Sequence, residues 1–417
     1  MNDIRIIGEG LEIRNDIKGI NSNDLIVGAS GAGKTRSYVI PNLFKTLGSK
    51  VVTDTKNTLY RKYGKALTNK GYTVECIDFV NPKHSTIGFN PFRHIRKDHK
   101  DLDIRRMAEA LCPVQKHDSE PIWSQSAQMV IQFSISYVLG MNAENHRDFS
   151  AVEDVIHLIG SDSLKEDVFK LAIEYPGCMA ERIYPKILSN MPAERMYASI
   201  IQFVNNSLNM VSDNDISNLY KMKNQISFED LGDKNTIIFL NISDSDRTRE
   251  ALVNIFYTQA LQVLMDLADQ KENAKLDVPV RFILDDFASN VVIPDFDKII
   301  SVIRSRNISV SVIIQSLTQL YSLYDEYTAM TIIDNCSAQI YMGGQSLRTA
   351  EIFAAKMDKL AKTLLSLPLE KQCVFITGCE PVIVNKYDLL KHEQELIEND
   401  TPTVKRKNRD KSGSKGK

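Results

Sequence analysis

The sequence predicts an α/β fold built on a mostly parallel central sheet. Three features support this: short apolar segments alternate with helical ones, a glycine-rich turn joins the first apolar segment to a helix, and a long helical block interrupts the series. Strands that alternate with helices are typical of a parallel sheet covered on both faces. With 417 residues, 43% of them hydrophobic and 25% charged, the composition is that of a globular protein with two domains, or one domain with a large insertion.

The expected strands start with a weakly alternating hairpin in IRIIGEGLEI, followed by a buried strand at 24–27. Later apolar segments, bounded by turn residues, predict further strands at 50–53, 72–79, 236–242, 278–284, 308–314 and 338–342. Near the end of the chain, segments 372–377 and 382–386 flank Gly378 and Pro381, which predicts an antiparallel hairpin at the sheet edge.

The middle of the chain, from 101 to about 219, contains no strand pattern. Segment 122–139 has helical periodicity and places five residues on one core-facing stripe: Ala127, Val130, Ile131, Ser134 and Val138. We therefore expect a sheet domain formed by 1–100 and 226–395, with an inserted all-α domain at 101–225. Segment 396–417 is rich in lysine, arginine, glycine and serine and is expected to be a disordered basic tail.

The turn after the first buried strand has the pattern of a phosphate-binding loop, GxxxxGK[ST]. It lies between a strand and a helix expected at 34–47, and it consists of Gly28, Ala29, Ser30, Gly31, Ala32, Gly33, Lys34 and Thr35. Backbone amides in such a turn face phosphate oxygens, and the helix amino terminus adds partial positive charge. We expect Lys34 to contact the β- and γ-phosphates of ATP and the Thr35 hydroxyl to bind Mg²⁺. These residues predict a P-loop NTPase.

Two adjacent carboxylates, Asp285 and Asp286, end a later apolar strand, VRFIL. Ligands of open α/β sheets bind at the carboxyl ends of the strands, so a simple surface turn is the weaker interpretation. Asp285 is expected to hold Mg²⁺ through water, and Asp286 to polarise the attacking water. The pair would complete a catalytic site with Lys34.

Other polar residues next to strands are candidates with two interpretations each. Asp54 follows the strand at 50–53, where it would line the site or cap the next helix. Gln315 follows the strand at 308–314, where its amide would project toward the γ-phosphate or lie on the surface. Arg304 and Arg306 precede that strand; in a ring, one of them would reach the neighbouring subunit's nucleotide, whereas alone both would be solvated.

The formal net charge of −2 excludes a protein that binds nucleic acid through its overall charge. Any DNA contact would need a local patch, whose residues the sequence does not identify. Charged residues interrupt the amino-terminal segment, so no secretory signal is predicted. The continuous apolar stretches fall short of the roughly 18 residues that a bilayer span requires. We therefore expect a soluble, cytoplasmic chain.

Several segments also form a series that extends from residue 25 to residue 388. They are GASGAGKTRSYVIPNLF, VVTDTKNTLY, GFNPF, IWSQSAQMVIQFSISYVL, FILDDFASNVVIPDFDKIISVIRSRNISVSVIIQSLTQL and IDNCSAQIYMGG. In this order they resemble the TraG/TraD-type coupling ATPases of conjugative type IV secretion systems, within the FtsK/HerA group of RecA-like motors. The series is far more specific than a P-loop alone.

The resemblance implies a RecA-like ATPase that uses ATP and Mg²⁺ and assembles as a homo-hexamer, or is a monomer when isolated. Such a protein would recruit relaxase-bound single-stranded DNA to membrane secretion channel components and help to drive it through the channel. Arg304, eleven residues before Gln315, has the spacing of the family's trans-acting arginine. In the family's D-x-K segment, only Asp54 and Lys56 carry over.

Two departures from the family leave alternatives open. Family members usually have a transmembrane anchor, whereas this sequence starts close to the P-loop. It would then be either a naturally soluble version or one that other proteins recruit to the inner face of the membrane. Asp286 stands where glutamate is usual and is one methylene shorter, which would slow hydrolysis. A nucleotide-binding docking adaptor with weak ATPase activity is therefore one alternative. An FtsK/HerA-like translocase of duplex DNA is another.

Overall fold

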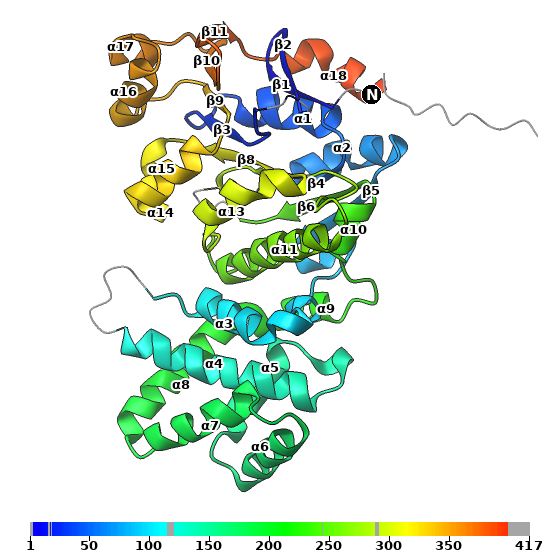
Figure 1. The fold of residues 1–417 in the computed structure, drawn as a ribbon, viewed down its shortest axis with the longest axis vertical. Helices are drawn as coiled ribbons and strands as arrows, with labels where there is room; N and C mark the ends of the chain where they lie inside the picture. Colours follow the sequence, from blue (N-terminus) through cyan, green and yellow to red (C-terminus); the bar gives the residue numbers. More distant parts are fainter. Residues whose placement is uncertain are drawn as a thin grey trace, which may run out of the picture.

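A nine-stranded sheet dominates one half of the molecule, and a stack of helices forms the other half (Figure 1). The computed structural model describes residues 3–15, 17, 19–114, 121–243, 245–287 and 292–398. The strand order is β11-β10-β9-β3-β8-β7-β4-β6-β5. The strands are β3 (Asp24–Val27), β4 (Ser49–Thr53), β5 (Thr73–Asp78), β6 (Thr236–Asn241), β7 (Val280–Leu284), β8 (Ile308–Ile314), β9 (Ala338–Tyr341), β10 (Lys371–Ile376) and β11 (Val382–Asn385).

Seven of these strands, β3 to β9, pair in parallel, while β10 runs antiparallel to both β9 and β11. The predicted mostly parallel sheet with an antiparallel hairpin at its edge is confirmed. Every residue of β3, β4, β6 and β7 is buried, because helices cover both faces of the sheet. The expected amino-terminal hairpin also forms, as a separate sheet of β1 (Ile4–Gly8) and β2 (Leu11–Arg14).

The helix after the glycine-rich turn differs from the continuous helix expected at 34–47. A π-helical turn, η1 (Thr35–Val39), comes first, and α1 (Ile40–Lys45) follows it. Pro41 explains the difference: it has no amide hydrogen to donate to the carbonyl of Ser37, and its ring would crowd that carbonyl. The wider turn therefore directly follows the predicted phosphate-binding residues.

Between β5 and β6 the chain forms only helical elements and connections, within residues 79–114 and 121–235 of the described chain. The longer helices are α3 (Lys100–Leu111), α4 (Ile122–Met141), α5 (Phe149–Leu158), α6 (Asp162–Glu174), α7 (Met179–Asn190), α8 (Glu194–Ser212), α9 (Asn214–Tyr220) and α10 (Glu229–Asp233). The outgoing and returning segments meet where the Gly88 amide donates to the carbonyl of Asn224 at 2.9 Å and the Ile226 amide donates to the carbonyl of Gly88 at 2.9 Å. A double connection thus joins the helical block to the sheet.

The remaining helices flank the sheet or follow it. They are α2 (Thr58–Asn69), α11 (Glu250–Gln270), α13 (Phe296–Val302), α14 (Leu317–Leu323), α15 (Glu326–Asp334), α16 (Leu347–Ala355), α17 (Ala361–Leu365) and α18 (Leu389–Glu398). The basic tail expected from residue 396 lies mostly outside the described residues, which end at 398 within α18.

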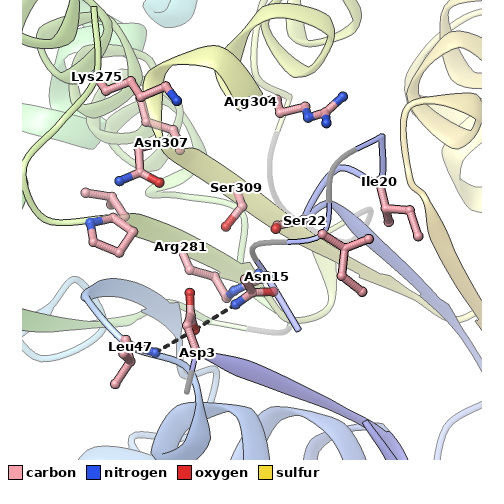
Figure 2. A pocket seen from close by; sticks show the side chains of 14 residues that line it. Asp3, Asn15, Ile20, Ser22, Leu47, Lys275, Arg281, Arg304, Asn307 and Ser309 are labelled. Atoms are coloured by element: carbon pink, nitrogen blue, oxygen red, sulfur yellow. Dashed lines mark hydrogen bonds between the residues drawn. The ribbon is translucent and has the colours of Figure 1, made fainter. Parts of the chain in front are cut away.

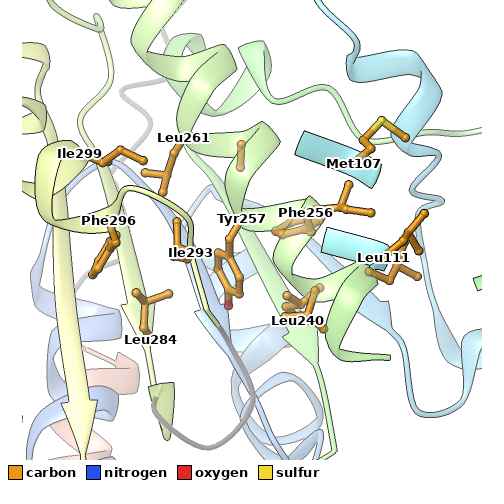
Figure 3. Packing of buried hydrophobic residues seen from close by; sticks show 14 of the residues in the cluster. Met107, Leu111, Leu240, Phe256, Tyr257, Leu261, Leu284, Ile293, Phe296 and Ile299 are labelled. Atoms are coloured by element: carbon orange, nitrogen blue, oxygen red, sulfur yellow. The ribbon is translucent and has the colours of Figure 1, made fainter. Parts of the chain in front are cut away.

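The helix α11 connects the two halves of the hydrophobic core. Figure 3 shows Phe256 and Tyr257 of α11 between strand residues such as Leu240 on one side and Met107 of α3 on the other. By length and composition alone, α11 could also cross a membrane, but 72% of its most apolar stretch is buried inside the fold. Polar residues interrupt its apolar run, so α11 contains no long continuous apolar stretch. The burial is that of a core helix.

Candidate nucleotide-binding site

The carboxyl ends of four adjacent strands, β3, β8, β7 and β4, surround a cavity of about 450 Å³. Polar residues follow β4, β7 and β8 directly, and the turn after β3 contributes Ser30 and Thr35, as expected for open parallel sheets. The cavity is lined by Ser30, Thr35, Thr53, Asp54, Thr55, Lys56, Thr58, Leu59, Ser245, Asp285, Asp286 and Gln315. The structure therefore brings together residues that are more than 200 positions apart in the sequence.

The glycine-rich turn from Gly28 to Thr35 follows β3 and bends around the mouth of this cavity. Gly31 and Gly33 have φ angles of +77° and +88°, a left-handed conformation that favours glycine. The turn is held from outside, because the Gly28 amide donates to the carbonyl of Ile314 at 3.1 Å and the Ala29 amide to that of Gly343 at 3.0 Å. Within the described chain, the amides of Ser30, Gly31 and Gly33 donate to no acceptor. Unused backbone donors on such a turn are suited to phosphate oxygens.

The Lys34 side chain lies inside this turn and is only 7% exposed. Its ammonium group donates to the carbonyl oxygens of Gly28 at 2.8 Å and Ala29 at 3.3 Å. These contacts keep the cation at the amino end of the helix that starts at Thr35, where an anionic ligand also gains from the helix dipole. The arrangement provides positive charge for a phosphate group.

Thr35 and Asp285 meet directly: the Thr35 hydroxyl donates to Oδ2 of Asp285 at 2.7 Å. Burial raises the pKa of Asp285 to about 6, the hydrogen bond from Thr35 opposes this shift, and the charge of Asp286 adds to it. A hydroxyl and two carboxylates are hard oxygen donors, the ligand type that Mg²⁺ prefers. The residues therefore fit a magnesium ion, whose positive charge would offset the cost of burying the Asp285 carboxylate.

Asp286 adopts a backbone conformation that the sequence did not indicate. Its φ angle is +51°, and its amide donates to Oδ1 of Asp285 at 3.1 Å. Aspartate accepts this left-handed conformation more readily than longer side chains do. The half-buried side chain lines the same cavity as Thr35 and Gln315. The backbone turn thus directs the two adjacent carboxylates of this strand end into one site.

Asp54 has both of the roles considered for it, because it caps the next helix and also lines the site. Its carboxylate accepts from the amides of Thr58 at 2.9 Å and Tyr60 at 2.9 Å, which caps α2, and it also lines the cavity. Burial raises the pKa of Asp54, and the backbone hydrogen bonds oppose the shift. Lys56 and Gln315 line the cavity as well.

Arg304 lies away from this site, on the turn η6 (Ile303–Arg306) before β8. The seven-residue strand β8 separates Arg304 from Gln315 and spans roughly 23 Å. Figure 2 shows Arg304 beside a different cavity, together with Lys275 and Ser309. A role for Arg304 at its own subunit's nucleotide is therefore incompatible with the fold, whereas a role in a neighbouring subunit is not.

The adjacent Arg306 is already engaged, because its guanidinium forms a two-point ion pair with Asp269 at 2.7 and 2.8 Å. Arg304 is exposed, and its side chain makes no ion pair or hydrogen bond within the described residues. The structure thus distinguishes two arginines that are only two positions apart.

The sequence did not indicate one residue of the site, Lys386. Lys386 follows β11, and its ammonium group donates to the carbonyls of Ala32 and Met342, each at 2.9 Å. It therefore connects the carboxyl-terminal hairpin to the tip of the glycine-rich turn. No local signal marks this lysine, because the contact depends on where β11 lies in the sheet.

The sequence also matches a known family across most of its length. The family described as Type IV secretory system conjugative DNA transfer matches residues 7–358. The chain belongs to this family. Among curated proteins, Protein VirD4 of Rhizobium rhizogenes and Protein VirD4 of Agrobacterium fabrum are both 24% identical to it over 330 residues. That alignment covers 78% of this chain but 47% and 48% of those proteins, so the chain spans about half of their length.

Several solved structures have the same fold. The bacterial conjugative coupling protein TrwBdeltaN70 aligns with a TM-score of 0.66 at 14% identity, covering 92% of this chain and 88% of that one. TrwB in complex with the ATP analogue ADPNP gives a TM-score of 0.63 at 15% identity, covering 87% and 84%. VirB4 of Thermoanaerobacter pseudethanolicus gives 0.58 at 14% identity, covering 94% and 98%. The family member described here thus has their fold, which confirms the RecA-like architecture.

Proposed function

We propose that this chain is a Mg²⁺-dependent ATPase that acts as the coupling protein of a conjugative type IV secretion system. The observation that carries the proposal is the 2.7 Å hydrogen bond between Thr35 and Asp285, which joins the glycine-rich turn to the acidic strand end. The similarity to TrwB structures that hold ADPNP, or ADP and Mg²⁺, supports the same ligands here.

Each residue of the site has a chemical role in this proposal. The free amides of Ser30, Gly31 and Gly33 receive phosphate oxygens, and the ammonium group of Lys34 exchanges its loop carbonyls for the β- and γ-phosphates. Thr35 and Asp285 hold the magnesium ion, which supplies charge stabilisation for the phosphates when bound. Asp286 orients and polarises the attacking water, and Gln315, which lines the same cavity, senses the γ-phosphate.

The cellular part of the proposal rests on family membership. We propose that ATP hydrolysis helps to move relaxase-bound single-stranded DNA into the secretion channel, and that six copies form a ring. In such a ring, Arg304 acts on the nucleotide of the neighbouring subunit, since its exposed guanidinium lies far from its own site. We further propose a cytoplasmic position at the inner face of the membrane, reached through other proteins.

Phosphate release by the purified protein, measured with and without single-stranded DNA and alongside its mass in solution, tests this function. We expect Mg²⁺-dependent release that DNA stimulates, and a Lys34→Ala variant that releases phosphate at least about 10²-fold more slowly because positioned charge at the phosphates is lost. Unchanged release by Lys34→Ala would overturn the ATPase assignment. Stimulation by duplex DNA alone would instead favour a duplex translocase.

The side chain of Asp286 favours a second candidate function, that of a docking adaptor which binds nucleotide and hydrolyses it poorly. Its carboxylate is one methylene shorter than the glutamate of the related motors, and its φ of +51° fixes the direction of this short side chain. An adaptor would show no DNA-stimulated release even when assembled. Asp286→Asn separates the two functions, because in an ATPase it lowers release by about 10²-fold or more while nucleotide affinity stays.

A further inference from the structure

Two adjoining cavities lie where the chain crosses between the sheet and the helical block. The first, of about 330 Å³, is lined by Arg93, Arg96, Lys97, Lys100 and Arg147, besides Glu144 and apolar residues. The second, of about 560 Å³, shares Arg93 with the first and adds Lys223 on the returning segment. We call Arg93, Lys97, Lys100, Arg147 and Lys223 the crossover tract.

The cations of the crossover tract are largely uncompensated. Within the described residues, Arg93, Lys97, Lys100 and Lys223 form no ion pair and no side-chain hydrogen bond, and the side chain of Arg147 donates only to the carbonyl of Asn142, at 2.9 Å. Arg96 differs from them, because Asp103 and Asp266 pair with it, the latter at 2.8 Å. The tract therefore consists of cations that no protein group neutralises.

The acids that line the two cavities do not change this balance. Glu144 is the single carboxylate that lines the first cavity. In the second cavity, Asp230 pairs with Lys234 at 3.0 Å, and Glu75 accepts a hydrogen bond from Thr86. Repulsion among unpaired cations costs free energy unless an anion binds between them. In a chain with a net charge of −2, such a concentration of positive charge indicates an anionic ligand.

The shape of the tract indicates an extended anion. Its residues come from η3 (Pro91–His94), η4 (Lys97–His99), the start of α3, the segment after η5 (Glu144–His146) and the returning segment. A single phosphate contacts only a few neighbouring cations, whereas a nucleic-acid strand presents a charge at every nucleotide. No side chain caps the amino end of α3, and ion pairs with Arg182 and Arg96 occupy the two acids of its first turn, Asp101 and Asp103. Its first amides therefore add partial positive charge at the same place.

We infer that the crossover tract binds the phosphodiester backbone of single-stranded DNA. The inference rests on the proposed function in DNA transfer and deepens it by assigning the residues that hold the strand. A strand in this position contacts both the sheet domain and the helical block, because α3 lies between α11 and α4 (Figure 1). Binding is independent of base sequence, because phosphate contacts carry no sequence information.

Anisotropy of a fluorescently labelled single-stranded oligonucleotide, titrated with full-length protein at several salt concentrations, tests the inference. In the variant R93Q/K97Q/K100Q/R147Q we expect affinity to fall by at least about tenfold at 0.1 M salt. The slope of log K against log salt should fall by about 0.7 per contact, or about 3 in total. The matched control K165Q/K170Q/K186Q/R195Q removes the same charge from α6 to α8 and should bind like the wild type.

Further measurements distinguish a failure of this inference from a failure of the proposed function. Basal phosphate release and thermal unfolding of the crossover variant should match the wild type, because its residues lie outside the nucleotide cavity. If the variant keeps both the affinity and the salt slope of the wild type, or if the control loses as much affinity, the inference is wrong. If the wild type binds no single-stranded DNA, the proposed DNA-transfer function itself fails.

A last titration tests whether the crossover tract binds a nucleic-acid strand or a single anion. Chloride is replaced by inorganic phosphate at equal ionic strength. An extended backbone site keeps the oligonucleotide bound, since separate phosphates do not match its linked contacts. Displacement of the oligonucleotide by phosphate would identify a single-phosphate pocket and overturn the inference.

Discussion

The hydroxyl of Thr35 donates a hydrogen bond to Asp285 across a sequence separation of 250 residues. The first residue ends the glycine-rich turn after β3, and the second follows β7, with β8 between the two strands in the sheet. Because all three strands are parallel, their carboxyl ends converge and the two oxygen donors meet. This contact defines the candidate metal-binding corner of the nucleotide site.

Asp285→Asn is the sharpest test of that corner. The amide can still accept the hydrogen bond from Thr35, but it lacks the negative charge that a magnesium ion requires. We expect Mg²⁺-dependent phosphate release to fall by roughly 10³-fold, since metal-ion charge stabilisation is worth several kcal/mol. Release at the wild-type rate would contradict the role of Asp285.

The same substitution also changes stability in a pH-dependent way. Burial raises the pKa of Asp285 from 3.8 to about 6, so the metal-free folded state binds more protons than the unfolded state between these values. Wild-type stability should therefore decrease as the pH rises through this window. In EDTA, Asp285→Asn should have the higher melting temperature at pH 7.5, and the difference should shrink toward pH 4. A constant difference would mean that ionisation of Asp285 is not its cause.

Arg304→Ala tests catalysis between subunits. An arginine supplied in trans contributes about 10³-fold or more to phosphate release, so we expect a loss of this size in assembled protein while nucleotide affinity is kept. Arg306→Ala is the control two positions away. It breaks the exposed pair with Asp269, which is worth about 0–1 kcal/mol of stability, and should leave release unchanged. Equal loss of nucleotide binding in Arg304→Ala would contradict a role confined to catalysis between subunits.

Lys386→Met tests the connection between the carboxyl-terminal hairpin and the glycine-rich turn. Methionine keeps a flexible side chain but cannot donate to the carbonyls of Ala32 and Met342. Each lost hydrogen bond from a charged group is worth about 1.5–3 kcal/mol, so we expect the KM for ATP to rise about tenfold or more, with a smaller change in kcat. Lys391→Met, on the exposed face of α18, is the control. A fall in kcat without a change in KM would contradict a role in shaping the turn.

His94 should make the fold sensitive to acid. Its ring packs against Phe89 and Phe228, with centroid distances of 5.7 and 4.3 Å, and burial lowers its pKa from 6.5 to about 3. The folded state thus binds fewer protons than the unfolded state, and stability is lost as the pH falls from about 6.5 toward 3. His94→Phe should show a weaker decrease in melting temperature between pH 7.5 and 5. An equally weak decrease in the exposed control His146→Gln would refute this explanation.

The amino-acid sequence alone determined the α/β class, the glycine-rich turn at Gly28 to Thr35 and the acidic end of β7. These features depend on neighbours in the chain: apolar periodicity, turn residues and the residues next to a strand end. The π-helical turn at Thr35–Val39 was missed although Pro41 marks it, because a proline near a helix start is compatible with several local geometries.

Only the tertiary structure decided which of these local features share a site. Strand order brings Thr35 to Asp285, brings Lys386 to the glycine-rich turn and keeps Arg304 away from its own nucleotide cavity. The position at which the helical block returns to the sheet brings the residues of the crossover tract together. Burial on both faces makes the parallel strands similar apolar segments, so their sequences do not specify which neighbour each one pairs with. That choice is made by packing of the whole chain, and it places the charges that the proposed chemistry needs.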